Sequence, residues 1–166
     1  MKAKTKTTKA VSNPLNYNKN VGKLINRWKR FFDNWAYETL ASEGYDFFKL
    51  SYMPFIMNIS ETGSSNTEIA AKAKVTKQAM SKVVKELEGK GLISSQKHET
   101  DARVSIIFLT PKGKSFIADT KKCVNKLGEE YKELVGVDNF EIMVDCIFKI
   151  NEYHESKTEN RTLHIL

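Results

Sequence analysis

Apolar residues recur at spacings of three and four along most of the chain, the pattern of helices that bury one face. The first such stretch covers residues 14–44, with Asn13 as the expected N-cap, Pro14 at the first helical position and Gly44 as the stop. Its apolar positions are Val21, Leu24, Ile25, Trp28, Phe31, Phe32, Trp35 and Leu40. One small core does not need so much aromatic surface, so we expect this stripe either to pack within the monomer or to face a partner helix.

Three shorter helices are predicted next. The first covers residues 50–59, with Ser51 as N-cap and Pro54 in the first turn, where its missing N–H costs little. A helix over about 67–73 and another over about 77–89 follow, joined by only three residues. Two helices with so short a connection are typical of a helix-turn-helix.

The hydrophobic period changes after Gly91. Segments 92–97 and 103–109 are short and rich in β-forming residues, and the polar segment 98–102 separates them. This arrangement predicts a β-hairpin.

Helical spacing returns in the last third of the chain. A helix is expected from Pro111, capped by Thr110, to Gly136. Its apolar stripe comprises Phe116, Ile117, Cys123, Val124, Leu127, Tyr131 and Leu134. A last helix is expected to open at Asp138, with Glu141 as its capping-box partner, and to carry Phe140, Met143, Val144, Ile147 and Ile150.

The helix predicted over 77–89 has two chemically different faces. At 100° per residue, the apolar face holds Ala79, Met80, Val83, Val84 and Leu87. The other side presents Lys77, Gln78, Ser81, Lys82 and Lys85. Lysine can bind phosphate or guanine, glutamine can pair with adenine, and serine bonds to either a groove edge or a phosphate. This face is therefore a candidate DNA-reading surface, and a solvated helix face is the alternative.

The predicted N-cap of that helix supports the same interpretation. Thr76 would direct the positive end of the helix dipole and its free N–H groups toward phosphate. The spacing suits a helix that enters a major groove end-first and reads bases with its first two turns.

The hairpin tip is a second candidate contact. It offers Lys97, His98 and Arg103, with Asp101 two residues before the arginine. An arginine on a hairpin tip can enter the minor groove, where the negative potential of A·T-rich DNA attracts its guanidinium. We expect Asp101 to orient that guanidinium or to cap the turn. A charged surface loop is the alternative interpretation.

Net charge points to a polyanionic partner. The 166 residues hold 27 Lys and Arg against 20 Asp and Glu, for a formal net charge of +7. Residues 1–30 include nine basic residues and no acid, and residues 1–12 have the composition of a disordered basic arm. Neutralising phosphates releases counterions, although a need for solubility would explain the charge equally well.

Catalysis and metal binding lack a candidate site in the sequence. Cys123 and Cys146 form no CxxC pair and lie within apolar stretches, so we interpret them as buried reduced thiols rather than a redox pair. The three histidines show no metal-ligand spacing, and nothing in the sequence indicates a serine or cysteine activated by a neighbouring base. We expect a protein that is not an enzyme and needs no cofactor.

Membrane insertion and secretion are not expected either. No stretch approaches the roughly 18 apolar residues of a membrane span, and no apolar segment follows the basic N-terminus. We therefore expect a cytoplasmic protein.

Several of these features together resemble the MarR-type (multiple antibiotic resistance regulator) winged-helix transcription factors. They are the order of elements, the segment VTKQAMSKVVKELEGKGLI (75–93), the Asp101-x-Arg103 tip and the Leu-Thr-Pro-Lys-Gly junction at 109–113. The resemblance covers about residues 15–155. It implies a mainly α fold with a small β-hairpin wing, in which a winged helix-turn-helix is inserted in a helical dimerisation domain.

The resemblance also implies a domain organisation. A basic arm (1–12) would precede dimerisation helices over 13–44 and 110–155, which enclose a DNA-binding winged helix over 50–109. A C-terminal tail would follow over 156–166. Core or interface packing is the expected role of Trp28, Trp35 and Tyr52, rather than the lining of a ligand cavity.

The function implied is that of a homodimeric transcription regulator of double-stranded DNA, a repressor that binds an inverted-repeat operator and is released by a small-molecule effector. The recognition-helix role falls on Lys77, Gln78, Ser81, Lys82 and Lys85, and the wing role on Arg103. Two alternatives remain: a non-specific nucleoid-type DNA-binding protein, and a winged helix that binds an acidic protein.

Overall fold

The computed structural model describes residues 20–73, 76–98 and 104–163, without the side chains of Lys77 and of residues 158–163. Its elements are α1 (Val21–Ser42), a 3-10 turn η1 (Leu50–Tyr52), α2 (Met53–Ile56), β1 (Ser64–Ser65), α3 (Asn66–Ala73), α4 (Lys77–Gly89), β2 (Ile93–Lys97), β3 (Ser105–Leu109), α5 (Pro111–Val135) and α6 (Val137–Leu163). This confirms the predicted fold class of helices with a small antiparallel sheet.

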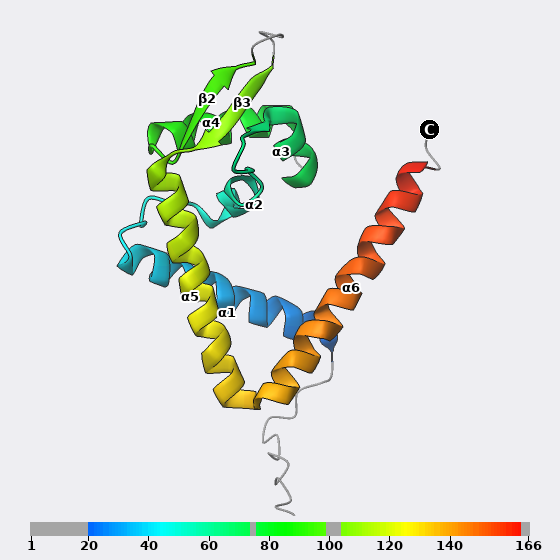
Figure 1. The fold of residues 1–166 in the computed structure, drawn as a ribbon. Coiled ribbons are helices and arrows are strands. Elements are labelled where there is room, and N and C mark those ends of the chain that lie inside the picture. Colours follow the sequence, from blue (N-terminus) through cyan, green and yellow to red (C-terminus); the bar gives the residue numbers. More distant parts are fainter. Residues whose placement is uncertain (1–19, 74–75, 99–103, 164–166) are drawn as a thin grey trace, which may run out of the picture.

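The elements form a winged-helix lobe and a set of long helices (Figure 1). Helices α2, α3 and α4 gather against the sheet in the upper lobe, and α5 extends from β3 away from it. Helix α6 turns back from the far end of α5, so the two helices form a V that α1 crosses (Figure 1). The winged-helix lobe and the long helices are therefore joined chiefly through α5 and the segment after α1.

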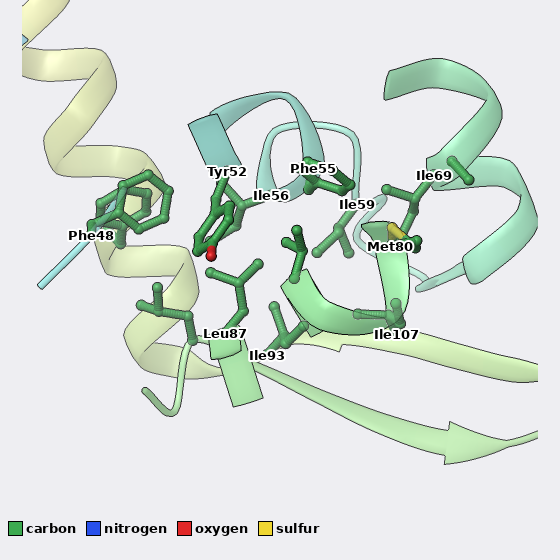
Figure 2. Close-up of a cluster of buried hydrophobic side chains, with 14 of the residues drawn as sticks. Phe48, Tyr52, Phe55, Ile56, Ile59, Ile69, Met80, Leu87, Ile93 and Ile107 are labelled. Atoms are coloured by element: carbon green, nitrogen blue, oxygen red, sulfur yellow. The ribbon is translucent and has the colours of Figure 1, made fainter. Parts of the chain in front are cut away.

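The hydrophobic core lies in the winged-helix lobe (Figure 2). Its largest fully buried side chains come from α2, α3, α4, the residue before β2, β3 and α5, and they are Ile56, Ile69, Leu87, Leu92, Ile107 and Phe116. Phe116 reaches this core from the first turns of α5, where its ring centroid lies 4.3 Å from that of Phe48. The core therefore fixes the start of α5 to the lobe.

The junction over residues 109–113 locks α5 to the sheet. The Thr110 hydroxyl accepts a hydrogen bond from the Gly113 N–H (3.0 Å) and donates one to the Gly91 carbonyl (2.6 Å). The Thr110 N–H donates to the carbonyl of Leu92 (3.1 Å). A Cβ at Gly113 would lie 2.0 Å from that same Leu92 oxygen. The threonine is thus both helix cap and strand tether, and only glycine fits at position 113.

Helix α1 begins at Val21, later in the chain than the predicted start. The start expected at residues 13–14 lies outside the described residues. Asn20 has an extended backbone and its Oδ1 accepts a hydrogen bond from the Lys23 N–H (3.1 Å), which begins the helix at Val21. The predicted stop is confirmed, since Gly44 has a φ of +84° just after the helix.

The single helix predicted over 50–59 is wrong. Ser51 lies inside the η1 turn and caps nothing, and α2 spans only Met53–Ile56. Pro54 does occupy the first turn of α2, as expected. The Asn58 side chain donates to the Pro54 carbonyl (2.6 Å), which ends the helix. The chain can then turn to bury Ile59.

The sheet has one strand that the sequence did not predict. Strand β1 pairs with β3, with Ser64 opposite Ile107, and gives the order β1-β3-β2. Two serines show no alternation of polar and apolar residues, so this strand leaves no periodic signal. The predicted hairpin is confirmed by β2 and β3, whose register pairs Ile93 with Leu109.

The start predicted for the last helix is displaced by one residue. Helix α6 begins at Val137, directly after Gly136 (φ +86°), so Asp138 lies in its first turn rather than at the cap. Glu141 makes no capping box and lies 3.6 Å from the Lys132 ammonium of α5. The backbone stays helical through residue 163, within the segment expected to be a tail. Residues 156–163 contain neither proline nor glycine to end the helix.

Candidate nucleic-acid interface

Helix α4 has the predicted bounds and N-cap, and its buried side is as predicted except at one position. The Thr76 hydroxyl accepts a hydrogen bond from the Ala79 N–H (3.2 Å), which confirms the N-cap. Met80, Val83 and Leu87 are buried in the core of the lobe. Ala79 is exposed, which corrects its assignment to the buried face. These three large side chains are sufficient to pack the helix against the core, so exposing the small Ala79 side chain costs little stability.

The opposite side of α4 is polar and exposed. Gln78, Ser81, Lys82 and Lys85 all lie at the surface, and the side chain of Lys77 lies outside the described ones. The structure therefore brings the four described candidates together on one solvent-facing surface of a single rigid helix.

The two acids of α4 are both engaged near its C-terminal end. Glu86 pairs with the Lys49 ammonium (2.7 Å), which also contacts the Tyr52 hydroxyl (3.1 Å). Hydrogen bonds from Lys49 and then from Tyr52 hold the pKa of Glu86 below its usual range. The Ser95 hydroxyl of β2 donates to the Glu88 carboxylate. Sequence reasoning missed this cluster, because nothing local links positions 37 residues apart.

The structure describes both strands of the wing, β2 and β3, but not the tip over residues 99–103. The Lys97–Ser105 pair ends the regular pairing of the hairpin, and the His98 N–H donates to the Val104 carbonyl (2.9 Å). Lys97 and His98 are exposed. The predicted contact Arg103 and its neighbour Asp101 lie outside the described residues, so their roles stay predictions.

An apolar cavity of about 310 Å³ separates the winged-helix lobe from the long helices. It is lined by α1, the η1–α2 segment and α5, through residues that include Phe32, Trp35, Leu50, Met53, Met57 and Cys123. Trp35 thus faces a cavity, contrary to the prediction, because it projects from α1 toward the gap beside α2. Trp28 also lines a hollow rather than packing in the core, between α1, α5 and α6. Tyr52 is a core residue as expected.

The cysteines differ in environment. Cys123 is half-buried beside the cavity, where burial raises the pKa of its thiol. Cys146 is exposed on α6, so the expectation of a buried thiol is wrong there. Among the described residues, no group of three or more histidine, cysteine or acidic side chains could hold a metal ion. No helix in the described part of the chain is long and apolar enough to cross a membrane.

Comparison with known protein sequences identifies the winged helix. Residues 56–105 match the family model described as MarR family. The HTH-type transcriptional regulator YdgJ of Bacillus subtilis (strain 168) is 23% identical over 86 residues, 52% of this chain and 52% of that protein. The matched region thus spans about half the length of this curated relative.

Solved structures resemble a larger part of the chain. A crystal structure of MarR has a TM-score of 0.68 at 16% identity and covers 82% of this chain and 98% of that one. A MarR transcriptional regulator from Methanosarcina mazei Go1 has a TM-score of 0.69 at 21% identity, with 82% and 96% covered. The transcriptional repressor CouR, solved with a 23-mer DNA duplex, has a TM-score of 0.63 at 23% identity, with 79% and 92% covered. Residues 56–105 of this chain are therefore similar to the MarR family, and the chain shares the overall fold of solved MarR-family transcription regulators.

Proposed function

We propose that the protein is a sequence-specific double-stranded DNA-binding transcription regulator that acts as a homodimeric repressor. The observation that carries the proposal is α4, which buries one side in the lobe and presents a continuous polar and basic side to solvent. The MarR-family match over 56–105 includes this helix, and CouR and MepR of the same fold were solved with DNA. We propose a role in the cytoplasm and without catalysis.

Each candidate residue has a proposed role. The first two turns of α4, with Lys77, Gln78, Ser81 and Lys82, would read base edges in the major groove. Lys85, one turn further from the capped end, would bind phosphate. Arg103 would enter the minor groove from the wing.

We further propose that one part of the chain binds DNA and that the others form the dimer. Residues 50–109 would bind DNA, and residues 13–44 and 110–155 would form the dimer. Support comes from the exposed apolar side chains of α1 and α6, such as Ile25, Phe31, Ile142 and Phe148. Two winged helices related by a twofold axis would read an inverted repeat, with half-site centres about one helical turn of DNA apart.

The 310 Å³ cavity is the proposed effector site. Its position between the two halves means that a bound molecule would contact both the η1–α2 segment and the long helices. The lining is mostly apolar, and its charged residue, Asp33, already pairs with Lys29. The cavity therefore suits a small, largely apolar compound. Small molecules also bind similar proteins: DNA binding of BpsR is regulated by 6-hydroxynicotinic acid, and PcaV was solved in complex with its natural ligand.

Alanine substitutions on α4 test the reading surface. On a duplex enriched by the parent protein, Gln78→Ala and Ser81→Ala should each cost about 1–3 kcal/mol and alter the base preference, since a base contact is lost. Lys85→Ala should weaken binding to all duplexes alike and reduce the salt slope by about one unit. Fluorescence anisotropy over a salt series measures both effects.

Lys121→Ala is the matched control for charge, because Lys121 is exposed on α5 away from α4. It should leave base preference unchanged. Equal losses on every duplex for Gln78→Ala, Ser81→Ala and Lys85→Ala would instead favour the non-specific nucleoid-type alternative.

A further inference from the structure

The ion pair between Lys49 and Glu86 connects the recognition helix to a distant part of the chain. Lys49 stands just before η1, and Glu86 lies near the end of α4. Their charged atoms are 2.7 Å apart, with 56% of the lysine side chain and 27% of the glutamate side chain exposed. The buried Tyr52 gives the lysine a second contact through its hydroxyl and its ring. The ammonium is therefore fixed from two sides.

This ion pair is one of two tethers on opposite flanks of α4. At 100° per residue, Glu86 and Glu88 project about 160° apart. Glu86 is held by Lys49 on the side of η1, and Glu88 by Ser95 on the side of the wing. Apolar packing by Met80, Val83 and Leu87 holds the helix against the core, and a roll of the helix about its own axis would also have to break the two flanking contacts. The two flanking contacts resist that rolling.

A small roll would disturb base reading. With an outer helix radius of about 5–6 Å, a roll of about 20° moves a side-chain tip by about 2 Å. Specific hydrogen bonds need placement within about 0.5 Å. Phosphate contacts through long lysines tolerate such a shift much better. The orientation of α4 therefore affects specific binding more than non-specific binding.

We propose that Lys49 is a positioning residue that fixes the orientation of the recognition helix through Glu86 and thereby sets its sequence selectivity. The inference rests on the proposed DNA-binding function. Lys49 acts without reading a base itself. The pair is partly exposed, so its loss should leave overall stability almost unchanged.

Charge-neutralising substitutions separate positioning from simple electrostatics. Electrostatics alone predicts that Lys49→Met weakens DNA binding and that Glu86→Gln strengthens it, because the two changes alter the net charge in opposite directions. Positioning predicts that both variants lower the same quantity, the ratio of affinity for an enriched duplex to affinity for a scrambled one. We expect about a fivefold loss of this ratio in each.

The experiment measures that ratio for the parent, Lys49→Met, Glu86→Gln, the double variant, Lys49→Arg and the control Lys29→Met. Lys29 also forms an ion pair, with Asp33 on α1, so its loss changes the charge equally at a site remote from α4. The double variant should lose no more than either single one, and Lys49→Arg should keep most of the ratio. Melting temperatures should stay within about 2 °C of the parent's, as expected for a partly exposed ion pair.

Three results would overturn the inference. They are an unchanged or higher ratio in Glu86→Gln, an equal loss in Lys29→Met, and a double variant that loses the product of the two single effects. A parent protein with no preference for any duplex would overturn the proposed function, and this inference with it.

Discussion

A carboxylate placed at an exposed apolar position of α6 is expected to turn the dimer into a monomer and to weaken operator binding by about 10²–10⁴-fold. The affinity loss follows because two linked half-site contacts become independent ones. Ile142→Asp and Phe148→Asp are the variants to make, since these side chains are 61% and 62% exposed in the single chain. In a dimer interface each new charge would be buried without a partner, which is strongly unfavourable.

The reason for expecting an interface here is the extent of exposed apolar surface. Helix α6 projects from the end of α5 (Figure 1), and along it Val137, Ile150 and Tyr153 are also exposed. In the last turn of α5, Leu134 is 79% exposed. This many exposed apolar side chains on one helix are typical of a protein interface.

Light scattering coupled to size exclusion measures the outcome. The parent should have about twice the chain mass of 19.0 kDa, and the two aspartate variants should approach the single-chain mass. Asn151→Asp is the matched control, because it adds the same charge at an exposed polar position of α6 and should remain a dimer. A parent of single-chain mass at tens of micromolar would refute the dimer.

Replacing Gly113 by alanine is expected to destabilise the protein by about 3 kcal/mol or more. The new methyl group would lie 2.0 Å from the Leu92 carbonyl oxygen, and this neighbour is backbone that cannot move aside cheaply. The same oxygen accepts the Thr110 N–H, so a shift would also break the tether between α5 and the sheet. For a chain of this size, the melting temperature should fall by about 6–12 °C.

Gly128→Ala provides the control within the same helix. A Cβ there would meet only Phe140 Cζ, at an ordinary 3.8 Å. Because glycine inside a helix costs roughly 0.5–1 kcal/mol relative to alanine, this variant should melt slightly higher than the parent. Thermal melts followed by circular dichroism at one protein concentration compare the two. A Gly113→Ala protein as stable as the parent would mean that the junction is not packed as described.

Elements with strong local signals could be predicted from the sequence. Helix α4 was predicted at its observed bounds because Thr76 caps it and its apolar residues repeat with a helical period. Thr110 and Pro111 likewise marked the start of α5, and Gly136 its end. In these cases the residues that decide the structure are neighbours along the chain.

Features that depend on distant residues could not be predicted. Strand β1 exists because Ser64 and Ser65 pair with β3, and two serines alone show no strand pattern. No local sequence pattern distinguishes Lys49 from other surface lysines, and only the folded chain brings it to Glu86. The end of α2 depends on how the chain turns to bury Ile59, which is likewise a property of the folded core.

In the candidate site, too, local features could be predicted from the sequence and features that depend on distant groups could not. The exposure of Gln78, Ser81, Lys82 and Lys85 followed from helical periodicity and is observed. Their proposed contacts with DNA depend on a partner molecule and on a second copy of the chain, which no periodicity encodes.

Selection from a library of randomised duplexes tests most directly whether a dimer of this chain reads a DNA sequence. The purified 166-residue chain would be incubated with the library at moderate salt, where non-specific affinity has fallen steeply, and the bound duplexes would be sequenced over several rounds. We expect enrichment of an inverted repeat with half-site centres about 10–10.5 bp apart. Bound duplexes that remain random in sequence after several rounds would contradict it.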